Sequence, residues 1–277
     1  MSARNVVIKG ADPRDAVLRV LILPHAGAGA AAGLAFAERA PADWLVATAR
    51  LPGRESRLRE GVPALPGLVA EVVTTLHSLP GTAPLIVVGV CSGAVIALEA
   101  VRAVQGAGGD LVAGLVVVSQ WAVTEEPDPD RPSLRDVDDP TRVLEILREF
   151  GGVPQSLAAD PEMLGLVLPA IVADMVAVED YTSGPEPLLA CPLLTVFGDA
   201  DDLCPDERTE DWALFGENVR GAWVPGGHML LTDSPEAVVD ALVGNLDQFT
   251  AGHAPQALSS TSRLARGATS TTGPTAG

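Results

Sequence analysis

The chain has 277 residues, of which 47% are apolar and 19% are charged. This composition provides a sizeable core and excludes a wholly disordered chain. The formal net charge of −18 and the 4% aromatic content argue against a nucleic-acid partner, because an acidic body repels phosphates and offers few rings for base stacking.

Short aliphatic and β-branched runs alternate with segments of helical periodicity along most of the chain. The runs that predict strands are Leu18–Leu23, Trp44–Ala49, Leu85–Val90, Leu115–Val118, Leu193–Phe197 and Ala222–Val224. The segments that predict helices are Leu65–Leu79, Ala94–Val104 and Pro235–Phe249. Continuous apolar strands separated by helices indicate an α/β fold, with a mostly parallel sheet covered by helices on both faces.

The segment from about residue 122 to 186 interrupts this alternation. It begins with an acidic, proline-rich loop and has no predicted strand. Its periodicity predicts two or three helices, over Pro140–Phe150, Pro161–Leu168 and Ala170–Tyr181. We interpret the segment as a helical lid inserted over the C-terminal edge of the sheet, where open α/β sheets bind ligands; another packed helical layer is the alternative. We expect residues 1–250 to form one domain and residues 251–277 to be a disordered tail.

Other features bound the class of protein. Three cysteines are too few for a disulfide scaffold, so we expect a cytoplasmic protein. The longest apolar run, Met163 to Ala173, contains Pro169 and is too short to span a membrane. The four histidines are scattered and no Cys-x-x-Cys pair occurs, so we predict no metal site.

The segment Gly89-Val90-Cys91-Ser92-Gly93 joins a predicted strand to a predicted helix. This spacing is typical of the nucleophile elbow, with cysteine in place of the usual serine. The glycines permit a strained turn in which the strand and helix backbones approach closely. Cys91 is therefore the predicted nucleophile, at a helix N-terminus that favours a thiolate. A buried cysteine in a glycine-rich turn is the alternative.

Two later turns supply the other members of a catalytic triad. His228 follows two glycines after one predicted strand, and an acidic run follows Gly198 after another. The order nucleophile, acid, histidine is that of α/β-hydrolases. The histidine removes and later returns the nucleophile's proton, and the acid orients the imidazole ring. Asp201 is the predicted acid because it lies about one turn beyond the glycine. The competing carboxylates are Asp199, Asp202 and Asp206.

The turn Leu23–Gly27 follows the first strongly predicted strand. Its backbone can supply one N–H group of an oxyanion hole, and the residue after the nucleophile, Ser92, can supply the second. An ordinary glycine turn is the alternative.

Together these motifs resemble those of type II thioesterases from polyketide and nonribosomal-peptide assembly lines, over roughly residues 19 to 249. The other matching segments are Leu51–Arg57, Gly151–Pro154, Asp160–Glu162, Ala173–Asp174, Glu179–Tyr181 and Pro225–His228. The resemblance implies a single α/β-hydrolase domain with a helical lid, and we expect a monomer. It also implies a substrate delivered on the phosphopantetheine of an acyl or peptidyl carrier protein, with no cofactor of the enzyme's own. By position, it assigns Cys91 as nucleophile, Asp201 as acid, His228 as base, and the backbones of Ala26 and Ser92 as the oxyanion hole.

Two residues depart from the family pattern. Ala28 replaces a second glycine, and Cys91 replaces the serine of the usual Gly-His-Ser-Met-Gly elbow. A cysteine acyl-enzyme keeps the acyl group as an activated thioester. We expect hydrolytic release or editing of acyl groups. The alternatives are an acyl or aminoacyl transferase between carrier proteins, a cyclase that releases its product by intramolecular attack, and, from another class, an inactive carrier-protein-binding module.

One dense basic cluster contains Arg50, Arg54, Arg57 and Arg59. Arg54 and Arg57 are candidates for binding the pantetheine phosphate or an acidic carrier surface. The alternative is that local ion pairs, such as one between Arg54 and Glu55, fix the loop.

Overall fold

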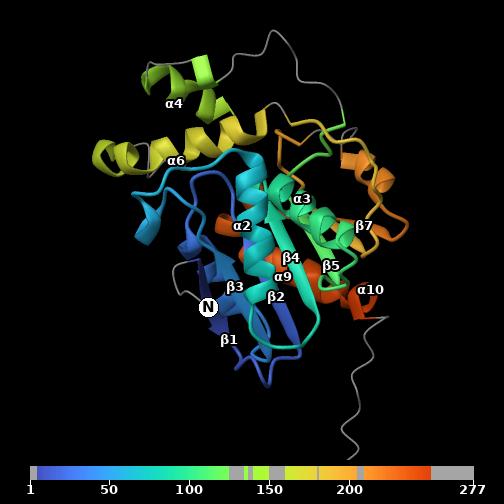
Figure 1. Cartoon of the computed structure of the whole chain (residues 1–277). Helices are drawn as coiled ribbons and strands as arrows, with labels where there is room; N and C mark the ends of the chain where they lie inside the picture. The colour runs from blue at the N-terminus through green and yellow to red at the C-terminus, as the bar shows by residue number, and fades with distance from the viewer. Residues whose placement is uncertain are drawn as a thin grey trace, which may run out of the picture.

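The computed structural model describes residues 5–124, 134–136, 140–149, 160–179, 181–204 and 209–250. One sheet of seven strands, in the order β1-β3-β2-β4-β5-β6-β7, forms the centre of the molecule (Figure 1). The strands are β1 (Val6–Gly10), β2 (Leu18–Leu23), β3 (Trp44–Ala49), β4 (Leu85–Val90), β5 (Gly114–Val118), β6 (Leu193–Gly198) and β7 (Val219–Val224). Strand β1 pairs with β3 in the antiparallel sense, and all other pairs are parallel. The predicted mostly parallel sheet is therefore confirmed.

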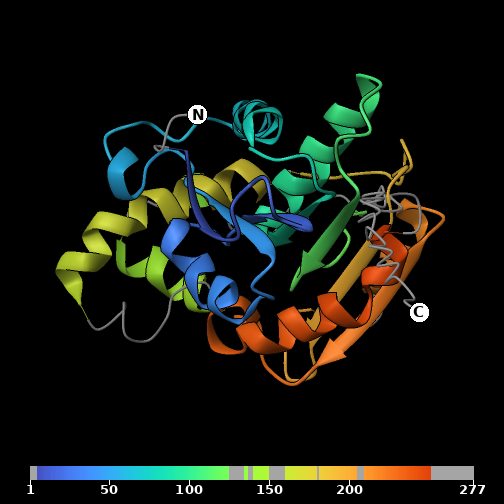
Figure 2. The same cartoon turned by 90° about the horizontal axis from the view of Figure 1, so that it is seen from below.

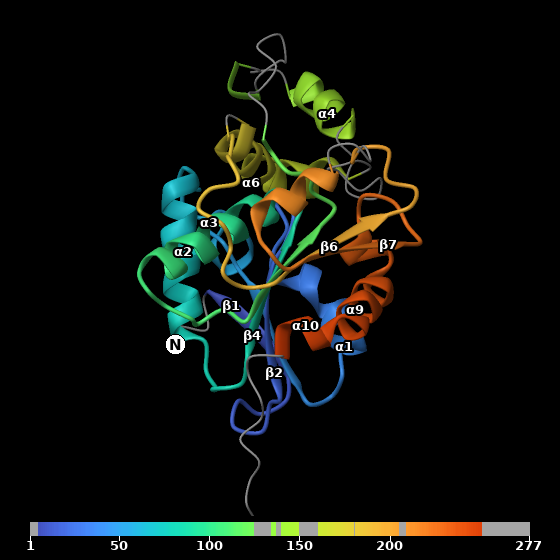
Figure 3. The same cartoon turned by 90° about the vertical axis from the view of Figure 1, so that its right-hand side faces the viewer.

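Helices cover both faces of this sheet, as Figures 2 and 3 show from two directions. Helices α2 (Leu65–Ser78) and α3 (Ser92–Gly106) pack on one face, and α1 (Leu34–Arg39) and α9 (Pro235–Gly244) pack on the other. Successive strand residues point to opposite faces. Val87 therefore joins the core beneath α2 and α3, whereas its neighbour Val88 joins the core beneath α1 and α9. This two-sided burial explains why the strands are continuous apolar runs.

The strand order changes direction around β2. From β2 the chain continues to β3 on one side, and it then returns to β4 on the other side. The loops that leave the C-terminal ends of β2 and β4 therefore diverge, and such a switch point is where open α/β sheets bind ligands. The predicted oxyanion loop and the predicted nucleophile follow these two strands.

The insertion between β5 and β6 contains η3 (Leu134–Asp136), α4 (Pro140–Glu149) and α6 (Pro161–Glu179), and no strand in its described residues. Of the two or three predicted helices, the division between Leu168 and Ala170 is wrong, because α6 continues through Pro169. Proline removes one helical hydrogen bond, but apolar residues on both sides of it pack against the rest of the molecule, including Leu164 and Ile171. Phe150 and the acidic loop before η3 lie outside the described residues.

Several short elements were not predicted. They are β1, α1, η1 (Ala30–Gly33), η2 (Glu55–Arg57), η3, η4 (Glu210–Phe215) and α8 (Leu230–Asp233). The predicted closing helix is divided at Asn245 into α9 and α10 (Leu246–Thr250). Strand β7 begins at Val219 rather than Ala222, because it is a partly exposed edge strand whose first residues lack a continuous apolar pattern. Residues 251–277 lie outside the described part. No helix in the described ranges has the length and apolarity needed to cross a membrane.

Candidate active site

Cys91 lies between the end of β4 and the first residue of α3. Its backbone has φ of 51° and ψ of −125°, a conformation that few non-glycine residues adopt. Its N–H donates to the carbonyl of Val118 at 2.9 Å. A Cβ at Gly89 would lie 2.5 Å from Cα of Ala94, and a Cβ at Gly93 would lie 2.4 Å from the carbonyl oxygen of Leu23. Both glycines are thus required by close backbone contact, as the elbow pattern predicts.

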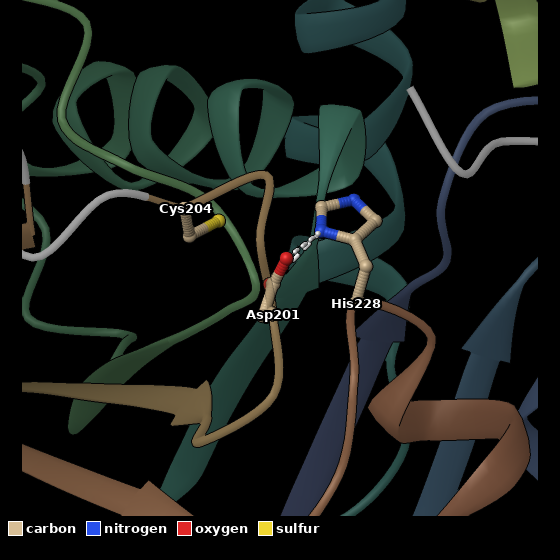
Figure 4. Close-up of side chains that lie close together, drawn as sticks. All are labelled: Asp201, Cys204 and His228. Atoms are coloured by element: carbon tan, nitrogen blue, oxygen red, sulfur yellow. Dashed lines mark hydrogen bonds and ion pairs between the residues drawn. The ribbon is translucent and has the colours of Figure 1, made fainter. Parts of the chain in front are cut away.

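The loops after β6 and β7 bring an acid and a histidine together. Nδ1 of His228 lies 3.0 Å and 3.2 Å from the two carboxylate oxygens of Asp201 (Figure 4). The loops touch directly, because the N–H of Ala200 donates to the carbonyl of Gly226 at 2.9 Å. The competing Asp199 instead accepts the N–H of Gly226 at 3.1 Å. The structure therefore pairs Asp201, and not Asp199, with the histidine; Asp206 lies outside the described residues.

The acid–histidine pair is shielded from solvent, with side-chain exposures of 9% for His228 and 0% for Asp201. Burial disfavours the charged imidazolium, but hydrogen bonding to Asp201 and interactions with the thiols of Cys204 and Cys91 outweigh it, so the pKa of His228 is raised. Burial also disfavours the carboxylate, yet its interaction with His228 keeps the pKa of Asp201 below its ordinary value. The pair is thus arranged to accept and hold a proton from a neighbouring thiol.

Cys204 is a site residue that the sequence analysis missed. Its thiol is buried, and its sulfur lies with the Asp201 carboxylate and the His228 ring in a group whose polar atoms are within 4.8 Å of one another (Figure 4). Burial raises the pKa of Cys204 to about 11. It is therefore a neutral thiol against the acid–histidine pair at neutral pH. The sequence signal that could have identified Cys204 is its position only three residues after Asp201.

The other histidines differ from His228. His25 lies in the loop after β2, close to His228. Burial lowers the pKa of His25 to about 4, with a smaller contribution from the charge of His228. His25 is therefore neutral at physiological pH and adds no repulsion to an imidazolium at His228. His77 lies on the exposed side of α2, and His253 lies outside the described residues.

The predicted oxyanion-hole residues lie at the ends of the two diverging strands. Ala26 follows β2, and Ser92 is the first residue of α3. Within the described residues, neither backbone N–H donates to a protein acceptor. The next N–H in the loop, that of Gly27, donates to the carboxylate of Asp174 on α6 at 2.8 Å. Backbone N–H groups without a protein acceptor are the kind of donor that an acyl-transfer oxyanion requires.

The basic cluster is largely occupied by ion pairs. The side chain of Arg54 is buried and pairs with Asp174, and that of Arg57 is buried and pairs with Glu60 and Glu71. Glu55 pairs with Arg50, not with Arg54. Neither Arg54 nor Arg57 presents its guanidinium group to solvent. The structure therefore supports the interpretation that ion pairs fix the loop, and not that these arginines dock a carrier protein. The partner of Arg54 is Asp174 and not the predicted Glu55.

A cavity of about 560 Å³ lies between α6 and the segment that leads into α2. Its walls are mostly apolar and come from Val62–Pro66 and from Ala173, Val176 and Ala177, with Arg135, Tyr181 and Thr182 also present. The hydroxyl of Tyr181 donates to Glu99 at 2.7 Å. Cys91, Asp201 and His228 are not among the lining residues, so the cavity is separate from the acid–histidine pair.

A family model described as a thioesterase domain matches residues 18–246. The chain belongs to the thioesterase family. The thioesterase PikA5 of Streptomyces venezuelae is 30% identical over 224 residues, which cover 80% of this chain and 78% of the relative. A probable anguibactin biosynthesis thioesterase, AngT of Vibrio anguillarum, is 29% identical over 232 residues, covering 80% of this chain and 89% of the relative.

Solved thioesterase structures have the same fold. RedJ, a thioesterase from the prodiginine biosynthetic pathway of Streptomyces coelicolor, superposes with a TM-score of 0.73 at 28% identity, covering 84% of this chain and 87% of RedJ. BorB, a type II thioesterase from the borrelidin biosynthetic cluster, superposes with a TM-score of 0.76 at 24% identity, covering 88% of this chain and 98% of BorB. The predicted α/β-hydrolase fold is confirmed for this thioesterase.

Proposed function

We propose that this thioesterase is a type II enzyme that removes acyl or aminoacyl groups from carrier proteins in polyketide or nonribosomal-peptide biosynthesis. The observation that carries the proposal is the arrangement of Cys91. It occupies a strained elbow, its thiol contributes to the raised pKa of His228, and His228 is held by Asp201. The biosynthetic roles named for AngT and RedJ support the choice of pathway class.

The proposed reaction begins when His228 takes the proton of the Cys91 thiol. The thiolate attacks the thioester carbonyl, and the N–H groups of Ala26 and Ser92 stabilise the oxyanion that forms. The carbon–sulfur bond to the pantetheine breaks, and its sulfur takes the proton from the imidazolium. Water then attacks the Cys91 acyl-enzyme while His228 removes its proton, so that a carboxylic acid leaves and the thiol is restored.

A transferase is the second candidate, and the cysteine itself favours it. Acyl transfer from pantetheine to a serine would form an oxoester and lose much of the thioester's activation. Transfer to Cys91 exchanges one thioester for another, so the acyl group remains activated for a second carrier or an internal nucleophile. The same residues serve in either case, because only the final acceptor differs.

Intact-protein mass spectrometry with an acyl-loaded carrier protein tests the proposal. We expect an acyl adduct on Cys91 that is lost in water as the free acid, and no adduct in Cys91→Ala. An adduct that is stable in water but is discharged by a second carrier would favour the transferase. Release of a product lighter than the acid by one water would indicate a cyclase. Carrier binding without an adduct would indicate a binding module and would refute the covalent mechanism.

A further inference from the structure

The loop that carries Ala26 is held from outside by two distant segments. The N–H of Gly27 donates to Oδ2 of Asp174, on α6, at 2.8 Å. Asp174 in turn forms a bidentate ion pair with Arg54, with N–O distances of 2.6 Å and 2.8 Å. Arg54 also donates to the carbonyls of Pro52 and, at 3.4 Å, Ala28. One carboxylate and one guanidinium therefore connect the oxyanion loop to α6 and to the loop after β3.

The ion pair is fully buried, with side-chain exposures of 4% for Arg54 and 2% for Asp174. Burying two charges costs several kcal/mol, so an ion pair of this kind is weak evidence for stability alone. A bidentate, charge-assisted pair does define geometry closely. The feature is therefore better suited to fixing the positions of the three segments than to stabilising the fold.

The oxyanion loop forms a tight turn, and α6 contacts this turn directly. The N–H of Ala28 donates to the carbonyl of His25 at 3.1 Å, which places Ala26 and Gly27 at the centre of a four-residue turn. Gly27 has φ of 71°, as the third position of a type II turn requires. A Cβ on Gly27 would lie 2.1 Å from Cγ1 of Ile171, so the helix touches the turn without a gap. The Asp174 carboxylate fixes the orientation of the central peptide by accepting its N–H.

We propose that Asp174 and Arg54 are positioning residues, which hold the turn so that the N–H of Ala26 points at the developing oxyanion. This inference rests on the proposed acyl transfer to Cys91. It assigns the C-terminal half of α6 a role in forming the active site. Neither residue touches the acyl group.

Two reactions of Cys91 distinguish a loss of oxyanion-loop positioning from a general disruption of the active site. Acylation by an acyl N-acetylcysteamine thioester passes through a tetrahedral oxyanion, whereas alkylation by iodoacetamide displaces iodide and forms no oxyanion. Both need the thiolate. We expect Asp174→Ala to slow acylation by ~10- to 100-fold, since a displacement of about 1 Å has this effect, and to leave alkylation within about twofold. Both rates are read by mass spectrometry on the peptide that contains Cys91.

Asp174→Asn is the conservative variant, because its amide oxygen can still accept the Gly27 N–H although the charge is lost. We expect its acylation rate to lie between those of the wild type and Asp174→Ala. Glu71→Gln is the matched control: it breaks the Arg57–Glu71 pair in the same region, and Glu71 has no hydrogen bond to α6 or to the oxyanion loop among the described residues, so both rates should be unchanged.

Acylation at the wild-type rate in both Asp174 variants would overturn the inference alone. Equal losses of acylation and alkylation, or failure of even Asp174→Asn to fold, would assign the pair a purely structural role and would also overturn it. A wild-type chain that is alkylated at Cys91 but never acylated there would overturn the proposed function, and this inference with it.

Discussion

Substitution of Gly93 by alanine tests the close contact between the elbow and the end of β2. The new Cβ would lie 2.4 Å from the carbonyl oxygen of Leu23 and 2.5 Å from that of Pro24. Cβ atoms essentially never approach closer than 3.0 Å, so the backbones must separate by about 0.6 Å. Overpacking costs about 1 to 3 kcal/mol. We expect a cost at the upper end of this range, because both contacts are with backbone atoms. The better helix propensity of alanine reduces that cost by up to about 1 kcal/mol.

The expected net loss is therefore about 2 kcal/mol of unfolding free energy, measured by urea unfolding. The displaced carbonyls lead directly into the oxyanion loop, so thioester hydrolysis should also fall by roughly tenfold, since a 1 Å displacement costs up to about 100-fold. Gly106→Ala at the other end of α3 is the matched control, because a Cβ there meets nothing within 4 Å. A Gly93→Ala variant as stable and as active as Gly106→Ala would refute the contact argument.

Three further predictions concern the site and its scaffold. The fold raises the pKa of His228, so the stabilisation from its protonated form is complete below pH 6.5 and is lost as the pH rises through the folded pKa. Asp201→Asn should lower that pKa in an NMR titration and cost about 2 kcal/mol in urea unfolding at pH 5 to 6; an unchanged titration would contradict the pairing. Arg19→Leu should cost about 3 kcal/mol in urea unfolding, because the buried guanidinium donates to the carbonyls of Ala83 and Leu79; a loss below about 0.5 kcal/mol would show these bonds to be unimportant. Cys91→Ser should reduce acyl transfer to a second carrier more than hydrolysis, measured as the ratio of the two products, and the opposite order would contradict the role of the thiol.

Local patterns predicted much of this thioesterase. Six of the seven strands and the nucleophile elbow follow from short-range rules: strands buried on both faces are continuous apolar runs, and a strained turn between strand and helix requires glycine at Gly89 and Gly93. The pairing of Asp201 with His228 was predicted only as a preference among neighbouring carboxylates. Whether Asp199 or Asp201 reaches His228 depends on the path of the loop after β6, and a single sequence does not specify that path.

The sequence by itself determined the fold class, the order of the candidate catalytic residues and the identity of the residue at the elbow, because each depends on neighbours along the chain. Only the tertiary structure decided that Arg54 pairs with Asp174, 120 residues away, and that Cys204 lies against the acid–histidine pair. It also decided that α6 continues through Pro169. The physical reason is the same in all three cases: the partner of a buried polar group, and the packing that holds a weakened helix, depend on which distant segments the fold brings together.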